Sequence, residues 1–264
     1  MSESEYEYHG MMAQTWDLFR GDTTNWEDRP FYLQIIHESG EPVLDVGCGT
    51  GRLLLDYLSQ GVDIDGVDNS PEMLDLCRQK AKEMRLKLTL FESSMETMSL
   101  PRPYQTILVP SSSFQLVLDP ILAQTAIVNL FTHLLPGGSL VMPFMKLWKE
   151  GHSLEWRLTG EKVRPIDGST VKRWSRNWFD PGTQLEHTED RYDVIRDGVI
   201  VATELHMRSP ATREYTQQQA QVLYTKAGFI DLHVYKGFTR LMASPDDEIF
   251  TITGKKPYSY PQSA

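Results

Sequence analysis

Short apolar runs alternate with stretches of helical spacing between residues 43 and 144. The runs at 43–46, 62–67, 87–91, 106–110 and 139–144 have the length of buried strands. Apolar residues recur with helical spacing over 53–60, over 71–84 and over about fifteen residues from Pro120. Because strands that alternate with helices pair in parallel through right-handed crossovers, we predict a parallel sheet with helices on both faces.

Cap and turn residues support these boundaries. Ser70 is a predicted N-cap that precedes a proline suited to the first helical position, and Pro136-Gly137-Gly138 is expected to stop the third helix. Thr216 and Gln219 form a predicted capping box for a helix that runs to about residue 227, with Gly228 after its end. The last two strands are expected at 229–235 and 247–254.

The pattern changes to strict alternation of apolar and polar residues from about 150 to 208. Asp197-Gly198 lies between two alternating runs and predicts a hairpin, and Asp180-Pro181-Gly182 marks an earlier turn. We therefore expect three or four antiparallel strands inserted into the parallel domain.

The most informative motif follows the first predicted strand. Asp45 lies in that strand, and Gly47, Gly49 and Gly51 follow it as a tight turn before a helix. A dinucleotide fingerprint would place its third glycine one residue later, where Arg52 stands. The D-x-G-x-G-x-G string instead resembles motif I of the class I S-adenosylmethionine (SAM) dependent methyltransferases.

This resemblance implies a fold, a cofactor and a set of residues. The fold is α/β, a Rossmann-like sheet of seven strands, and the cofactor is SAM, with S-adenosylhomocysteine as product. The glycine loop would approach the amino-acid part of SAM. Asp68, at the end of the second strand, would accept hydrogen bonds from the ribose; the alternative is that Asp68 merely caps the helix at Pro71.

Further cofactor contacts are expected from the neighbouring segments. Ser94 stands where the family places an adenine-binding Asp, with Glu92 or Glu96 as substitutes. Met95 would pack on the adenine, and Met73 would either cover the adenine or ribose or lie in the core. The N-terminal segment is rich in aromatic residues and resembles the lid of small-molecule methyltransferases, with Trp16-Asp17 as a lid element. Arg29 would pair with the SAM carboxylate.

The acceptor would lie beyond the fourth strand and under the inserted sheet. The three serines of Ser111–Ser113 would orient a polar substrate or simply form the loop, and Phe114 would line the pocket. Trp174, Arg176 and Trp178 share one strand face, which would hold a substrate, form an ordinary outer face or make a dimer contact. The possible bases are Glu204, His206, His152 and Tyr192; the histidines are scattered in sequence, and no metal site is expected.

These arguments give two sets of candidate residues and four segments. The expected cofactor-binding residues are Trp16, Arg29, Asp45, Gly47, Cys48, Gly49, Gly51, Asp68, Asn69, Met73, Ser94, Met95, Pro110 and Ser111, and the expected substrate-binding residues are Ser113, Phe114, Trp156 and Trp174. Residues 1–40 would form lid helices, 41–149 and 209–256 the SAM-binding domain, 150–208 the antiparallel roof, and 257–264 a loose tail.

Composition narrows the class of partner. The net charge of −10 over 264 residues disfavours nucleic acid, which needs a basic surface. No apolar run is long enough to span a bilayer, and the acidic N-terminus is unlike a signal peptide. With two cysteines, one of them in the glycine loop, a disulfide framework is not expected, which favours the cytoplasm. A homodimer is one expected assembly, with the face of Trp174, Arg176 and Trp178 as its contact.

The sequence thus predicts a SAM-dependent methyltransferase that moves the sulfonium methyl group to a small-molecule nitrogen or oxygen by in-line displacement. The alternatives are a SAM-using enzyme of another reaction type and an inactive SAM-binding protein. In-line transfer needs alignment and exclusion of water more than it needs a catalytic dyad.

Overall fold

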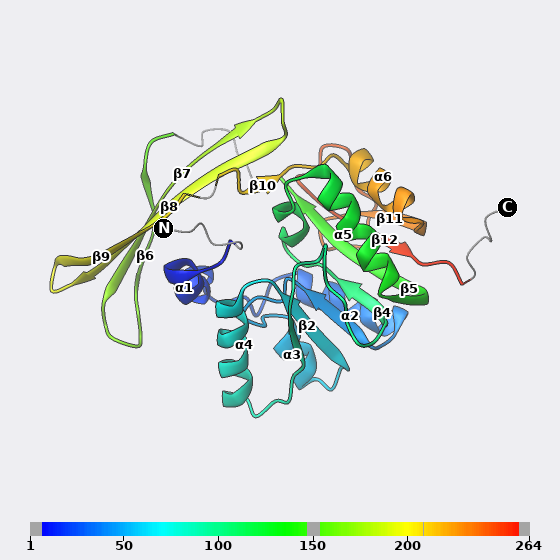
Figure 1. Cartoon of the computed structure of the whole chain (residues 1–264), viewed down its shortest axis with the longest axis horizontal. Coiled ribbons are helices and arrows are strands. Elements are labelled where there is room, and N and C mark those ends of the chain that lie inside the picture. Colours follow the sequence, from blue (N-terminus) through cyan, green and yellow to red (C-terminus); the bar gives the residue numbers. More distant parts are fainter. Residues whose placement is uncertain (1–6, 147–153, 208, 259–264) are drawn as a thin grey trace.

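The computed structural model describes residues 7–146, 154–207 and 209–258, which fold into two sheets and several helices (Figure 1). The helices are α1 (Gly10–Arg20), α2 (Asp28–Ser39), α3 (Leu54–Ser59), α4 (Pro71–Glu83), α5 (Pro120–Thr132) and α6 (Gln217–Ala227), with a 3₁₀ turn at Ser113–Leu116. The larger sheet contains β1 (Val43–Val46), β2 (Ile64–Asp68), β3 (Leu90–Glu92), β4 (Tyr104–Leu108), β5 (Leu134–Met145), β11 (Ile230–Lys236) and β12 (Ile249–Lys255). The second sheet contains β6 (Arg157–Val163), β7 (Thr170–Asp180), β8 (Leu185–Arg196), β9 (Val199–His206) and β10 (Thr212–Arg213).

The larger sheet confirms the predicted fold class. In the described residues its seven strands follow the order β11-β12-β5-β4-β1-β2-β3, and all neighbouring pairs are parallel except those of β12. One apolar core lies between this sheet and α5 with α6, and a second lies between the sheet and α2, α3 and α4. Helices therefore cover both faces, and the carboxyl ends of β1, β2 and β4 meet at one edge.

The predicted caps are present. Ser70 accepts a hydrogen bond from the Met73 N–H at the start of α4, and Thr216 and Gln219 form the capping box of α6. Gly228 has the left-handed conformation that ends α6. These local signals were sufficient to position both helices.

One strand boundary differs from the expected one. β5 begins at Leu134 and includes Pro136-Gly137-Gly138, which we expected to separate helix from strand. Tyr104 pairs with Leu134 while Thr106 pairs with Ser139, so extra residues bulge from β5. The helix α5 ends before this bulge, at Thr132.

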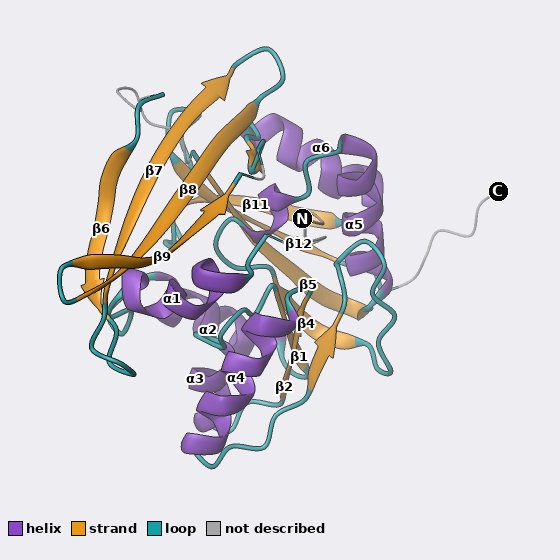
Figure 2. Ribbon diagram, turned by 60° about the vertical axis from the view of Figure 1, so that its left-hand side comes forward, coloured by secondary structure: helices purple, strands orange, loops and turns teal. Residues whose placement is uncertain are grey.

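The second sheet is antiparallel and lies beside the first (Figure 2). Its four long strands confirm the predicted number, and β10 adds a two-residue edge just beyond the expected 150–208 range. Met11 and Met12 of α1 pack on Val171, Tyr192 and Val194. The helix α1 therefore lies against one face of this sheet.

Among the described residues, no helix has both the length and the apolar character needed to cross a membrane.

Candidate functional site

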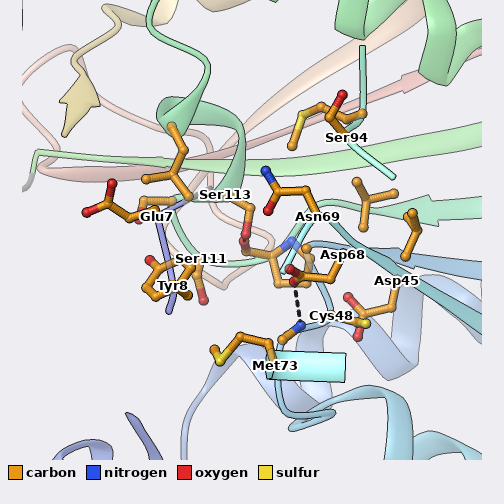
Figure 3. A pocket seen from close by; sticks show the side chains of 18 of the residues that line it. Glu7, Tyr8, Asp45, Cys48, Asp68, Asn69, Met73, Ser94, Ser111 and Ser113 are labelled. Atoms are coloured by element: carbon orange, nitrogen blue, oxygen red, sulfur yellow. Dashed lines mark hydrogen bonds between the residues drawn. The ribbon is translucent and has the colours of Figure 1, made fainter. Parts of the chain in front are cut away.

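A cavity of about 750 Å³ opens where the carboxyl ends of β1, β2 and β4 meet (Figure 3). This volume is in the range of sites that hold a small organic ligand or cofactor. The loop after β1, the ends of β2 and β3, the loop after β4 and the N-terminal segment all contribute to its lining. The site thus occupies the position where parallel α/β sheets bind ligands.

The glycine loop brings backbone to the cavity wall. Gly47 has a φ of 72°, and a Cβ there would lie 2.6 Å from the Ser113 hydroxyl, so a larger residue would displace the loop that follows β4. The N–H of Gly49 donates to Asp68 Oδ2 at 2.8 Å. This bond, drawn in Figure 3, ties the loop after β1 to the end of β2.

Asp68 is a buried carboxylate whose partners are backbone N–H groups. Oδ1 accepts from Ser70 N at 2.9 Å, and Oδ2 from Gly49 N. Burial raises the pKa of Asp68, and the hydrogen bonds from backbone N–H groups oppose that shift. The N-cap of α4 is Ser70 and not Asp68, so the alternative role of Asp68 as a helix cap is excluded. Asp68 lies in the cavity lining, where the two backbone N–H groups fix the orientation of its carboxylate.

Asp45 is a second buried carboxylate in the lining. Its Oδ1 has no hydrogen-bond partner among the described residues. Burial raises the pKa of Asp45 to about 7, with the nearby Arg52 guanidinium opposing the shift. A buried acceptor without a partner is costly, so this oxygen fits a ligand that brings a donor or a positive charge.

The N-terminal segment covers the cavity. Tyr8, Trp16 and Arg20 contribute to its lining. The Tyr8 and Trp16 rings meet edge to face with centroids 4.7 Å apart, and the Arg20 guanidinium lies 4.8 Å from the Trp16 ring centroid. Arg20 therefore places a positive charge in the cavity wall.

The covering segment is fastened to the glycine loop and to α4. Asp17 accepts from the Thr50 hydroxyl at 2.8 Å and pairs with Lys80 at 2.5 Å. The Ser70 hydroxyl donates to the Tyr8 carbonyl at 2.5 Å. These contacts hold α1 over the glycine loop, as the expected Trp16-Asp17 element requires.

Most of the predicted cofactor residues come together in the cavity. The lining includes Trp16, Asp45, Gly47, Cys48, Gly49, Asp68, Asn69, Met73, Ser94, Met95, Pro110 and Ser111, and of the predicted substrate residues Ser113. The two substitutes proposed for Ser94, Glu92 and Glu96, also lie there. Ser111 has a φ of 57°, an uncommon conformation for a residue with a side chain.

Two predicted cofactor residues lie outside the cavity lining. Arg29 pairs with Asp56 at 2.9 Å and donates to the Arg52 carbonyl, so its charge is used on α3 instead of the cavity. Gly51 faces α4, where a Cβ would lie 2.6 Å from Cys77 Sγ. Its absent side chain permits helix packing and does not form part of the cavity wall.

Three predicted substrate residues also lie elsewhere. Phe114 is 1% exposed and packs on Phe144 and Tyr215 in the core. Val171 faces α1, so by strand alternation Trp174 lies on the opposite face of β7, beneath the Arg191 guanidinium. Trp156 lies under Arg176, which belongs to that same outer face of β7. Periodicity identified the shared face correctly but not the direction in which it points.

Of the possible bases, the three that the structure describes, Glu204, His206 and Tyr192, do not belong to the lining. Tyr192 packs on α1, and His206 is buried with its Nε2 2.6 Å from Glu204 Oε1. His152 lies outside the described residues. His206 nevertheless has two possible metal ligands beside it, Glu204 and His9, which sequence reasoning did not bring together.

Sequence reasoning missed Glu7 and Arg20 of the lining, whereas Tyr8 belongs to the aromatic N-terminal segment that was expected to form the lid. One signal was available for Arg20, which follows Trp16 by four residues and therefore shares its face of α1. Arg29 was a weaker candidate for the SAM carboxylate because it lies in the first turn of a different helix, α2, and not on α1 with Trp16.

Comparison with known proteins agrees with this geometry. Residues 43–138 match the methyltransferase domain family. A methyltransferase of Geobacillus sp. (strain WCH70) is 23% identical over 223 residues, which cover 83% of this chain and 86% of the relative. The ubiquinone biosynthesis O-methyltransferase of a Vibrio cholerae strain is 30% identical over 102 residues, which span 37% of this chain and 42% of that enzyme.

Two solved structures have the same fold. A SAM-dependent methyltransferase from Clostridium acetobutylicum superposes with a TM-score of 0.75 at 18% identity, over 92% of this chain and 96% of the other. The sugar N-methyltransferase KedS8 of a Streptoalloteichus species superposes with a TM-score of 0.70 at 20% identity, over 97% and 98%. The chain therefore contains a match to a methyltransferase domain over residues 43–138, and it shares its fold with solved SAM-dependent methyltransferases.

Proposed function

We propose that this protein transfers the sulfonium methyl group of SAM to a nitrogen or oxygen atom of a small molecule. One observation carries the proposal: the glycine loop, Asp45 and Asp68 line a single cavity that the N-terminal segment covers. These groups match the polar parts of SAM one by one.

The amino-acid end of SAM carries a carboxylate and an ammonium group. Arg20 supplies a guanidinium to the cavity wall, and Asp45 supplies the buried Oδ1 without a partner. We assign the carboxylate to Arg20, with backbone N–H groups of the glycine loop, and the ammonium to Asp45. The ammonium would satisfy the buried Asp45 oxygen that the protein alone leaves without a partner.

The nucleoside end of SAM fits the other half of the lining. We assign the ribose hydroxyls to Asp68, whose oxygens are fixed by Gly49 N and Ser70 N. Met73, which is 2% exposed, and Met95 offer apolar contact to the adenine. Ser94 is a weak adenine partner because its hydroxyl is 3.0 Å from Thr97 Oγ1, so Glu92 and Glu96 stay alternatives.

When bound, SAM supplies an electrophilic methyl group on a sulfonium. The residues of the chain exclude water and fix the direction of approach: the lid segment covers the cavity, and its Tyr8 and Trp16 rings present aromatic surface toward a cation. Alignment of this kind accounts for a large part of the rate in transfers from an activated donor. A neutral amine needs no base, because its lone pair attacks the methyl carbon directly and the resulting ammonium releases its proton to solvent, whereas a hydroxyl acceptor has to give up its proton to a base or to water.

The acceptor is expected beside the loop that follows β4. Ser111 lines the cavity in its uncommon conformation, while the Ser113 hydroxyl donates to the Pro110 carbonyl and stabilises the loop. Leu116, Val117 and Ala211 form an apolar rim. One structural neighbour is a sugar N-methyltransferase, which supports nitrogen as the first acceptor to test.

The segments have separate proposed roles. Residues 1–40 act as the lid. The insertion at 150–208 supports this lid through α1, and within the described part of that range no residue lines the cavity. A role for the insertion as a direct roof over the substrate is therefore a weaker proposal than its role as a support.

Two further proposals concern the cellular location of the protein and its oligomeric state. A cytoplasmic location is supported by its two free, buried cysteines. A homodimer is supported by the edge strand β9, where Val199, Ile200 and Val201 are each more than half exposed. Light scattering of the wild type and of Ile200→Lys tests the dimer, which the substitution is expected to weaken.

The function is tested by incubation with SAM and a panel of small amines and alcohols, followed by mass spectrometry of the sulfur product. Methyl transfer yields S-adenosylhomocysteine together with a methylated acceptor. Methylthioadenosine would indicate another reaction type. Absence of SAM binding in calorimetry would contradict the proposal outright.

A further inference from the structure

We propose that His9, Glu204 and His206 form a binding site for a divalent transition-metal ion at the junction of the lid and the second sheet. One ligand atom from each residue lies within 4.8 Å of the other two. The cluster is outside the lining of the SAM cavity. It is therefore a separate site from the methyl-transfer centre.

The second sheet provides two of the three ligands. Glu204 and His206 are two positions apart on β9, so both side chains project from the same face of the strand. Their partners across β8 are Tyr192 and Asp190. Because Tyr192 packs on α1, this face of the sheet is the one directed at the lid.

The lid provides the third ligand. His9 immediately precedes α1, and its ring lies 4.4 Å from the His206 ring, centroid to centroid. Gly10 lets the two elements approach: a Cβ there would lie 2.1 Å from Glu204 Oε1. The Met11 N–H donates to the same oxygen at 2.8 Å. Glycine at position 10 thus lets the carboxylate lie beside the lid backbone.

The ligands are held in place before any ion binds. His206 Nε2 lies 2.6 Å from Glu204 Oε1, and the His206 side chain is only 4% exposed. The Glu204 side chain is 37% exposed, which leaves a path for an ion. Coordination through Nε2 displaces its proton, which moves to the other ring nitrogen or to solvent, and requires the carboxylate to move by about an ångström to reach metal-ligand spacing.

The charge around the cluster favours a cation. Glu72 accepts from the Gly10 N–H at 2.7 Å, and Asp190 lies opposite His206 in the sheet. Two groups oppose it: Arg173 lies 3.9 Å from Asp190, and the amino end of α1 carries partial positive charge. Glu72 and Glu204 each receive one of the α1 N–H groups and so compensate that end of the helix.

The donor set indicates the class of metal. Two imidazole nitrogens and one carboxylate oxygen suit Zn²⁺, Ni²⁺ or Co²⁺ better than Mg²⁺ or Ca²⁺, which prefer oxygen alone. Three protein ligands leave a fourth position for water. Such an ion would join the lid to the inserted sheet and hold α1 over the SAM cavity.

Calorimetric titration of chelator-treated protein with Zn²⁺ tests the proposal, with Co²⁺ absorption as a second readout. We expect one ion per chain with micromolar or tighter affinity, and at least tenfold weaker binding in His9→Gln and His206→Gln. His187→Gln is the matched control, because His187 lies on the opposite face of the sheet, stacked on Trp178. It should bind Zn²⁺ as the wild type does.

The two ligand variants guard against a folding artefact. His206 is buried and its replacement can destabilise the sheet, whereas His9 lies in the lid and is partly exposed. Circular dichroism and SAM binding establish that each variant is folded. Equal Zn²⁺ affinity in the wild type and His9→Gln, or no binding below about 100 μM, would overturn the proposal and leave a hydrogen-bonded contact only.

Discussion

The glycine loop after β1 and the inserted sheet differ in how their side chains are directed. In the loop, positive φ angles at Gly47 and Gly49 and the hydrogen bond from Gly49 to Asp68 fix the direction of the backbone N–H groups and of the carboxylate. In the sheet, which face meets the rest of the protein depends on the packing of Val171, Tyr192 and Val194 against α1. A binding site built from local motifs can thus be predicted from the sequence. The role of a sheet face cannot, because it depends on which element packs against that face.

Substitution of Asp68, which lies at the end of β2 and is bonded to the glycine loop, should have the largest effect. Asp68→Asn keeps the shape of the side chain but replaces the charged acceptor of the ribose hydroxyls, so we expect SAM to bind about 30–150 times more weakly. Calorimetry measures this affinity. Asp63→Asn is the control at the far end of β2, where the carboxylate pairs with Arg102, and SAM affinity there should be unchanged.

Arg20 and Arg29 distinguish the assignment made from the structure, in which Arg20 binds the SAM carboxylate, from the sequence prediction, which gave that role to Arg29. Arg20→Met removes the guanidinium from the cavity wall, and we expect SAM affinity to fall about 10–50-fold. Arg29→Met removes an ion pair with Asp56 and a hydrogen bond to the Arg52 carbonyl, both outside the cavity lining, so SAM affinity should change less than threefold. The reverse order in calorimetry would restore Arg29 as the carboxylate partner.

Asp45 should show opposite effects on stability and on binding. Its pKa of about 7 in the folded chain exceeds the value near 4 of an unfolded chain, so its contribution to stability is full below pH about 4 and is lost as the pH rises to about 7. The asparagine of Asp45→Asn stays neutral at all pH values. At pH 8 we therefore expect the SAM-free variant to be more stable than the wild type, with a free energy of unfolding about 1–3 kcal/mol higher. Its SAM affinity should nevertheless fall about tenfold.

Urea unfolding at pH 5 and pH 8 without SAM checks the Asp45 prediction. Asp63→Asn supplies a control of opposite sign, because the hydrogen bond from Arg102 lowers the pKa of Asp63. That contribution is present above the unfolded pKa and lost as the pH falls. A stability of Asp45→Asn that equals the wild type at both pH values would mean that Asp45 is ionised without cost.

The outer face of the inserted sheet should give the smallest effect. Trp174 lies under Arg191 on the face opposite α1, so Trp174→Phe should alter SAM affinity and the methylation rate less than twofold. Steady-state kinetics with the acceptor identified by mass spectrometry measure both. A tenfold loss of kcat/KM would show that the outer face contacts the substrate after all.

The sequence was a good guide where a short segment determines its own geometry. The D-x-G-x-G-x-G string, the Ser70 cap and the Thr216–Gln219 box each depend on residues a few positions apart. It was a poor guide to Phe114, which follows a cavity-lining loop but turns into the core against Phe144 and Tyr215. Arg20 shares a helix face with Trp16, a local signal that was not used, whereas the His9–Glu204–His206 cluster depends on contacts between distant segments that no local pattern records.

The most direct test of the account is the fate of SAM labelled on its methyl carbon, incubated with a panel of small amines and followed by mass spectrometry. At a SAM concentration near the wild-type Kd, we predict equal amounts of S-adenosylhomocysteine and of a labelled N-methyl product, both reduced more than about tenfold in Asp68→Asn and retained in Asp63→Asn. Labelled methylthioadenosine, or a product yield that Asp68→Asn leaves unchanged, would contradict the assignment of this cavity as the site of methyl transfer.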